Sequence, residues 1–217
     1  GKYFYISPRT KFKISASDEQ SVVEHILYGV NEASAPEQYT EEFKLETPKG
    51  VQTIYYTAID SVDNKAQTGR KVVYMDDASP VTAIDIKRPQ FFNRDTLFIS
   101  KSTPIELFAK DYESGLDYIE YSVDGGGFKK FEGNFNIEEE GFHTIKFRSY
   151  DKVHNLESVK ESEVFVDNNA PAIYANFSIR PIGSETHEGG PLKVYPTYTK
   201  LYLGATDKNS GAESIHY

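Results

Sequence analysis

The chain has 217 residues, a net charge of −9 and no cysteine. The absence of cysteine excludes disulfides, thiol catalysis and cysteine-ligated zinc, and the acidic balance argues against a nucleic-acid partner, because phosphate binding needs clustered cations. No run of apolar residues is long enough to cross a bilayer, so the sequence predicts no membrane span.

The first residues, from Gly1 to Tyr5, lack the basic-then-apolar layout of a signal peptide, so we expect an export signal to have been removed or to lie outside them. From Lys11 to Ala16 polar and apolar residues alternate, which places every second side chain on one face of a strand. The chain is rich in strand-favouring residues, with 16 Tyr and 14 Phe, and shows no helical period. These features predict an all-β protein.

The strongest pattern is an internal repeat of about 90 residues, a length that suits a whole sandwich domain and not a solenoid unit. The positions that recur in its first part are Thr10, Phe12, Ile14, Ala16 and Asp18, then Thr103, Ile105, Leu107, Ala109 and Asp111, and finally Thr199, Leu201, Leu203, Ala205 and Asp207. After each aspartate come a turn and a strand with an Ile-x-Tyr pair, which begins at Ile26, Ile119 and Ile215.

The later part of the repeat agrees with this alignment. The matched positions are Gly50, Thr53, Ile54, Tyr56, Asp60 and Asn64 in the first copy and Gly141, Thr144, Ile145, Phe147, Asp151 and Asn155 in the second. Each copy closes with an alternating strand and then a proline, Pro80 or Pro171, which cannot donate to a central ladder. The sequence therefore predicts tandem immunoglobulin-like antiparallel β-sandwiches, two complete and a third partial that stops at Tyr217 within its second matched strand.

The predicted boundaries are 1–79 for the first domain, 80–95 for a linker or lead strand, 96–170 for the second domain, 171–193 for another linker or lead strand, and 194–217 for the partial third. From the alternation we expect the first core to contain Phe12, Ile14, Ile26, Tyr28, Ile54, Tyr56 and Val73. We expect the second core to contain Ile105, Leu107, Ile119, Tyr121, Ile145, Phe147 and Phe165.

The second copy resembles the bacterial immunoglobulin-like repeats of outer-membrane and surface proteins. The resemblance rests on Thr-x-Ile-x-Leu-x-Ala-x-Asp at 103–111, Ser-Gly at 114–115, Ile-x-Tyr-Ser-Val-Asp-Gly-Gly at 119–126, Gly-x-His-Thr-Ile at 141–145 and Asp-x-x-x-Asn-x-Glu at 151–157. The first copy lacks the Ser-Gly and Gly-Gly elements, and the third is only a beginning. The resemblance implies exported tandem arrays that hold a partner domain away from the membrane or bind polymers and host proteins, without a catalytic residue.

A calcium site is one interpretation of the acidic residues at the repeat boundaries. In immunoglobulin topology the loops after the second strand and before the last strand lie at one end of the sandwich, where the closing segment of the preceding repeat arrives. Calcium binds six to eight oxygen ligands. The candidate ligands are Asp76, Asp77, Asp111, Glu113, Asp151, Asp167, Asp207 and Asn209. The favoured alternative is that each aspartate hydrogen-bonds its own turn, which explains the recurrence without a metal.

Aromatic residues, histidines and serines are the other kinds of residue that could form a site. The aromatic residues Phe91, Phe92, Tyr195 and Tyr198 are candidates for stacking on sugar rings, although junctions and strands ordinarily bury such side chains. The five histidines show no pair at zinc-site spacing, and serines lie on turns without a nucleophile elbow. We therefore expect no catalytic residue and no cofactor other than calcium.

Three hypotheses for function follow. The first is a non-catalytic binding and spacer array of a bacterial surface or periplasmic protein, with further domains in the parent chain. The second is a carbohydrate-binding accessory region of a polysaccharide-active enzyme, and the third is a calcium-rigidified adhesion rod. All three place the partner, a protein or a polysaccharide, at the cell envelope.

Overall fold

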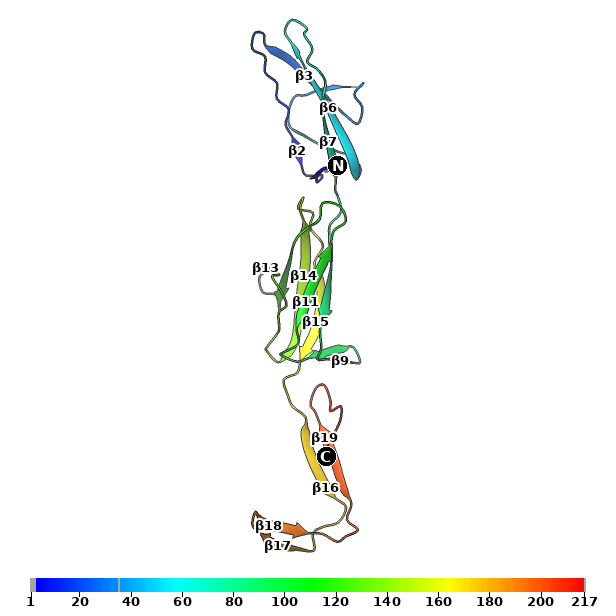
Figure 1. Cartoon of the computed structure of the whole chain (residues 1–217), viewed down its shortest axis with the longest axis vertical. Helices are drawn as coiled ribbons and strands as arrows, with labels where there is room; N and C mark the ends of the chain where they lie inside the picture. The colour runs from blue at the N-terminus through cyan, green and yellow to red at the C-terminus, as the bar shows by residue number, and fades with distance from the viewer. Residues whose placement is uncertain (1–2, 35, 217) are drawn as a thin grey trace. The chain divides into compact units, whose positions relative to one another are not determined.

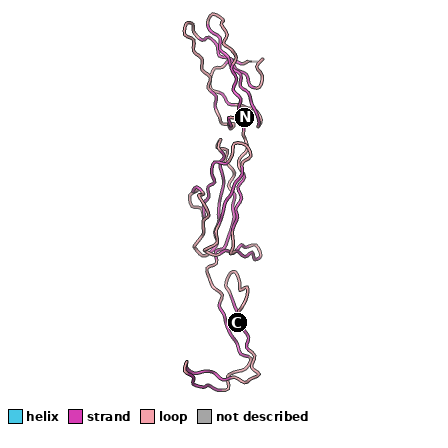
Figure 2. Tube along the Cα trace, viewed as in Figure 1, coloured by secondary structure: helices cyan, strands magenta, loops and turns pink. Residues whose placement is uncertain are grey.

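The computed structural model describes residues 3–34 and 36–216, and all the helix or strand structure in these residues is β-strand (Figure 2). The all-β prediction is therefore confirmed. In the described part of the chain, no helix is long and apolar enough to span a membrane. The chain divides into two compact units, one made of residues 1–85, 106–134 and 145–162, the other of residues 86–105, 135–144 and 163–217.

The first repeat is built on a five-stranded sheet in the order β1-β7-β6-β3-β4, with a separate two-stranded sheet, β2-β5. Its strands are β1 (Phe4–Ile6), β2 (Lys11–Phe12), β3 (Val23–Val30), β4 (Glu37–Gln38), β5 (Phe43–Lys44), β6 (Gly50–Asp60) and β7 (Gly69–Met75) (Figure 1). The first strand runs parallel to the last, with Ile6 opposite Met75, while β3, β6 and β7 pair antiparallel.

The second repeat has the same plan, because its sheet runs β13-β12-β14-β15-β10-β9 and β10 again pairs parallel with the closing strand β15. A lead strand, β8, pairs with β11 in a two-stranded sheet. The strands are β8 (Val81–Ile86), β9 (Gln90–Asn93), β10 (Thr96–Ile99), β11 (Ile105–Lys110), β12 (Leu116–Val123), β13 (Lys129–Lys130), β14 (Gly141–Asp151) and β15 (Lys160–Val166). In both repeats the closing strand, β7 or β15, pairs parallel with one earlier strand, β1 or β10, and antiparallel strands follow in the same order. The sequence repeat is therefore a repeat of fold.

The third repeat begins in the same way as the second, because β16 (Ala172–Phe177) pairs antiparallel with β19 (Leu201–Thr206), as β8 pairs with β11. Between them lies a hairpin of β17 (Gly183–His187) and β18 (Gly190–Val194). The tandem immunoglobulin-like organisation is thus two repeats and the start of a third. The exact domain boundaries predicted from the sequence remain predictions.

The first core differs in part from the prediction. Its buried members are Ile6, Leu45, Ile54, Val73 and Met75, against which Phe12, Val30 and Phe43 pack. Of the other expected members, Ile14, Ile26 and Tyr28 are only half-buried.

Tyr56 was wrongly placed in this core, because its side chain is 38% exposed. The burial alternation of β6 breaks after Ile54, so that Thr57 is buried and donates its hydroxyl to the Ala66 carbonyl at 2.8 Å. Tyr56 lies opposite Gly69, and a Cβ on that glycine would come within 2.5 Å of the Tyr56 ring. The ring therefore covers a glycine on the neighbouring strand instead of entering the core.

The second core follows the prediction more closely, since six of the expected residues are buried: Ile105, Leu107, Ile119, Tyr121, Ile145 and Phe147. The exception is Phe165, which was wrongly assigned. Val164 and Val166 are the buried residues of β15, and strand alternation turns Phe165 to the opposite face. There its ring contacts Phe98 and Phe142, with centroid distances of 5.3 and 4.9 Å.

Candidate functional site

A turn of the form Asp-x-x-x-Asn follows the long strand of each complete repeat. In the second repeat Asp151 Oδ1 accepts the backbone N–H groups of Val153 and Asn155 at 2.9 and 2.6 Å, and Oδ2 accepts the Asn155 side-chain amide at 2.8 Å. Asp60 makes the same three bonds, to Val62 and Asn64. These carboxylates hold their own turns, as the Asx interpretation predicts.

Hydrogen bonding sets the acidity of Asp60. Burial alone would raise the pKa of Asp60, but hydrogen bonds from Asn64, Ser21 and Val62 outweigh it and lower the pKa to about 2. Asp60 therefore carries its charge throughout the neutral range.

A second turn, Asp-x-x-Ser-Gly, follows the first matched strand of repeats two and three. The strand predicted to begin at Ile215 was wrong for the described residues, because residues 211–216 are not in a strand. Asp111 Oδ1 accepts the Gly115 N–H at 2.7 Å, and Asp207 Oδ1 accepts the Gly211 N–H at 2.9 Å. Both glycines have φ of +91°, a conformation that side chains with a Cβ rarely adopt. In this geometry the N–H of the preceding serine points away from its own turn, toward the carboxylate of the aspartate that closes the repeat before.

The closing aspartate of one repeat accepts that serine N–H at both junctions. Asp76 follows β7, and its Oδ2 accepts the Ser114 N–H at 3.0 Å. Asp167 follows β15, and its Oδ2 accepts the Ser210 N–H at 3.0 Å. The two contacts have the same atoms and the same length. We call the surroundings of Asp76 and Ser114 the first junction and those of Asp167 and Ser210 the second junction; each lies within one compact unit.

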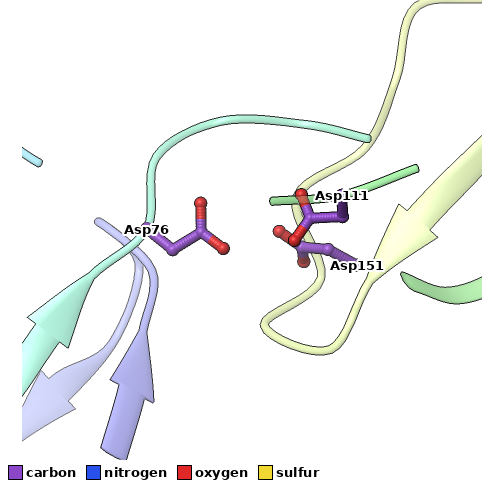
Figure 3. A group of neighbouring side chains, drawn as sticks. All are labelled: Asp76, Asp111 and Asp151. Atoms are coloured by element: carbon purple, nitrogen blue, oxygen red, sulfur yellow. The ribbon is translucent and has the colours of Figure 1, made fainter. Parts of the chain in front are cut away.

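The first junction gathers three carboxylates. Asp76, Asp111 and Asp151 each place one carboxylate oxygen within 4.8 Å of the others (Figure 3). Asp76 comes from the segment after β7 and faces the other two, which belong to the second repeat. Asp76 and Asp151 are fully buried. The sequence prediction that these three residues lie close together matches the geometry, while calcium binding there remains a prediction.

Amide groups and basic side chains surround these carboxylates. The Asn155 side-chain amide donates to the backbone carbonyls of Asp76 and Ala78 at 2.9 and 3.0 Å. Arg9 of the first repeat donates to the carbonyl of His154 at 2.5 Å and to that of Val153 at 3.2 Å. These bonds fasten the closing segment of the first repeat, and Arg9 after its first strand, to the Asp-x-x-x-Asn turn of the second.

Glu113, one of the predicted calcium ligands, forms an ion pair with Lys49 of the first repeat, and its role in calcium binding stays a prediction. The hydrogen bond to Glu113 raises the pKa of Lys49. Asp77 is exposed.

The second junction has fewer groups around its carboxylate. The Asn209 side-chain amide donates to Asp167 Oδ1 at 3.2 Å, and the Asn169 N–H donates to the same oxygen at 3.1 Å. Burial acts to raise the pKa of Asp167, but hydrogen bonds from Ser210, Asn169 and Asn209 lower it overall. The predicted ligands Asp167, Asp207 and Asn209 are thus brought together as a hydrogen-bonded group.

The structure also shows a buried group to which the sequence assigned no role. Glu157 accepts the Thr82 N–H at 2.9 Å, the Thr82 hydroxyl at 2.5 Å and the Ser149 hydroxyl at 3.1 Å. Lys160 pairs with Glu157 at 2.7 Å and donates to the Thr82 carbonyl. Burial acts to raise the pKa of Glu157, but the bonds from Lys160, Thr82 and Ser149 lower it. Glu157 therefore ties the lead strand β8 to the second repeat.

The predicted aromatic residues do not form one group. Phe91 and Phe92 lie on β9 and are 53% and 65% exposed, opposite Phe98 and Leu97 of β10. Tyr195 stacks on Phe177 with a centroid distance of 4.2 Å, whereas Tyr198 is 72% exposed. Their sugar-binding role stays a prediction.

No protein-family model matches the chain. No curated protein matches it either. A solved structure of the fibronectin(III)-like modules of Clostridium thermocellum CbhA is similar, with a TM-score of 0.43 and 14% identity, covering 76% of this chain and 89% of that chain.

Proposed function

We propose that the chain is a non-catalytic binding and spacer array of a bacterial surface or periplasmic protein, in which each repeat is fastened to the next through its closing aspartate. The observation that supports this is the recurrence of one contact, from Asp76 to the Ser114 N–H and from Asp167 to the Ser210 N–H, both at 3.0 Å. A contact that recurs at successive junctions is expected of an array whose repeats act mechanically together, and not of a single active site.

The test measures whether repeats one and two tumble together in solution. Backbone ¹⁵N relaxation of the full chain is expected to give the same rotational correlation time for amides of β6 and of β14, and different times once Asp76→Ala removes the acceptor. Asp77→Asn is the matched control, because Asp77 is exposed and next in sequence. Independent tumbling of the two repeats in the unsubstituted chain would contradict the proposal.

The envelope location has a separate test. In cells that express the parent protein, protease added outside intact cells or to the opened periplasm is expected to cleave the array, while a cytoplasmic marker survives. Digestion only after the cytoplasm is opened would contradict this part of the proposal.

A second candidate function, calcium-dependent stiffening, is favoured by the three carboxylates that meet within 4.8 Å at the first junction. The Asp76, Asp111 and Asp151 oxygens are hard ligands of the kind calcium binds, and a divalent cation would offset the repulsion of three neighbouring charges. Each of them, however, already accepts backbone N–H groups.

Calorimetric titration with calcium, together with melting curves in excess calcium or chelator, decides whether calcium or hydrogen bonding alone holds the first junction. Calcium binding predicts saturable heat and a raised melting temperature, both lost in Asp111→Asn. An unchanged melting temperature with and without chelator would leave hydrogen bonding alone as the basis of the junction.

A further inference from the structure

The first repeat carries the same two turns as the second, but two residues differ at the end where a preceding repeat would attach. Val22 stands where repeats two and three have Gly115 and Gly211. Ala66 stands where the second repeat has Glu157, the residue that binds the lead strand. The first difference lies next to the serine whose N–H binds the closing aspartate of another repeat, and the second removes the carboxylate that binds the lead strand after that aspartate.

The glycine difference changes where the serine N–H points. In the second repeat the Ser114 N–H binds Asp76, an acceptor from outside the repeat. In the first repeat the Ser21 N–H donates to its own Asp18 at 2.6 Å, and the Ser21 hydroxyl binds Asp18 and Asp60. Bonds from Ser21 and Gln20 lower the pKa of Asp18. Valine disfavours the φ of +91° found at the two glycines, so the first turn closes on itself.

The hollow at this end of the first repeat is the counterpart of the filled first junction. It has a volume of about 480 Å³ and is lined by Asp18, Ser21, Asp60 and Asn64 among others. In the second repeat the corresponding residues, Asp111, Ser114, Asp151 and Asn155, hold Asp76 and the segment that follows it. The second repeat therefore shows what the matched surface holds when it is filled, namely a closing aspartate and the lead strand that follows it.

We propose that the glycine after the serine and the glutamate of the Asp-x-x-x-Asn-x-Glu turn form a receptor for the closing aspartate of a preceding repeat and for the lead strand that follows that aspartate, and that Val22 and Ala66 close the first repeat to such a partner. This inference rests on the proposed array function and refines it. It makes the second repeat a receiving repeat and gives the third repeat the glycine of the receptor, Gly211, while the first repeat donates its closing aspartate and does not accept one. The two positions set the direction and the register in which repeats of this kind join.

The first experiment removes the receptor at a junction that is filled. Gly115→Val is expected to speed amide hydrogen exchange of Ser114 by about 10- to 100-fold, because the Ser114 N–H then no longer donates to the Asp76 carboxylate. The Asn155 N–H, bonded to Asp151 within the repeat, is the internal control and should keep its protection if the fold is intact. Unchanged Ser114 exchange in a folded Gly115→Val chain would overturn the inference.

The second experiment builds the receptor where it is missing. A synthetic peptide of residues 73–87 is titrated into the ¹⁵N-labelled full chain carrying Val22→Gly and Ala66→Glu together. The Ser21 amide resonance is expected to shift, with an affinity at least about tenfold higher than that of the unsubstituted chain. A peptide with Asp76→Asn should lose most of this response, and Val22→Ala, which supplies no glycine, should not create it.

The outcomes separate the inference from the array function. An unsubstituted chain that binds the peptide as tightly as the double variant, or a folded double variant that does not bind it, would overturn the inference. Fast Ser114 exchange in the unsubstituted chain would instead count against the junction contact itself, and so against the array function. Protection of Ser114 that survives Gly115→Val would overturn the inference and leave the array function standing.

Discussion

The two junctions share one contact and differ in everything around it. At the first junction the closing aspartate is fully buried, and Asn155 and Arg9 add bonds from both sides. At the second junction Asp167 is half-buried, and Asn209 takes the position of Glu113 and donates directly to the closing carboxylate. The aspartate-to-serine bond is therefore the constant part of the connection, while the polar residues around it differ between the two junctions.

Removing the aspartate-to-serine bond is expected to have the largest effect on the free energy of unfolding. Asp76→Ala leaves the buried N–H groups of Ala78 and Ser114 without their acceptor, at a cost of about 2–4 kcal/mol to the free energy of unfolding. Asp167→Ala exposes its donors more readily to water, so we expect about half that loss. Urea denaturation followed by hydrogen exchange at Ser114 and Ser210 measures both. Equal losses at the two junctions would contradict the role given to burial.

Asn155 and Asn64 occupy the same position of the Asp-x-x-x-Asn turn, so replacing each of them compares a turn that makes bonds across a junction with one that does not. Asn155→Ala removes bonds to Asp76, Ala78 and Asp151, with an expected loss of about 2 kcal/mol in the free energy of unfolding. Asn64→Ala is the matched change in the first repeat, where the amide binds Asp60, and its loss is expected to be smaller. Denaturant titration of both variants checks the ranking; a larger effect at position 64 would show that the bonds across the junction contribute little.

The repeat itself was predictable from the sequence because periodic apolar residues and recurring turn aspartates leave a pattern in residue types. Asp76, Asp111 and Asp151 were placed together for this reason. Their main partners were not predictable, since Ser114 acts through its backbone N–H, which every residue except proline has. The signal that was available is the serine that recurs three residues after each turn aspartate.

The residues that were wrongly predicted to lie in the cores also have local causes for their placement. Tyr56 and Phe147 are matched in sequence, but only Tyr56 faces a glycine across the sheet, and its ring covers that gap. Phe165 was expected in the core, although strand alternation places Val164 and Val166 on the buried face together. Glu157 was part of a recognised pattern, but its role depends on Thr82 of a strand that comes much earlier in the chain.

A smaller effect is expected from the charged bonds that only the first junction has. Arg9 is exposed and binds carbonyl groups of the Asp-x-x-x-Asn turn, so Arg9→Ala should cost under about 1 kcal/mol in the free energy of unfolding. The loss should shrink at high salt because exposed charges are screened. Ser102→Ala, at the matched position of the second repeat, is the control. Melting curves at low and high salt measure the difference, and a salt-independent loss would point to packing instead.

The smallest expected effect is a shift in acidity confined to the second junction. Hydrogen bonds hold the pKa of Asp167 below the usual value of 3.8, so its contribution to stability is complete above that value and is lost as the pH falls through the lower, folded pKa. Asn209→Ala removes one donor and should raise the pKa of Asp167 toward 3.8, which moves the loss of stability to higher pH. Carboxyl ¹³C titration by NMR measures this directly, with Asp60 as the reference that should stay at about 2. If Asp167 titrates unchanged in the variant, the Asn209 bond is not formed in solution, and the second junction is held by the Ser210 N–H alone.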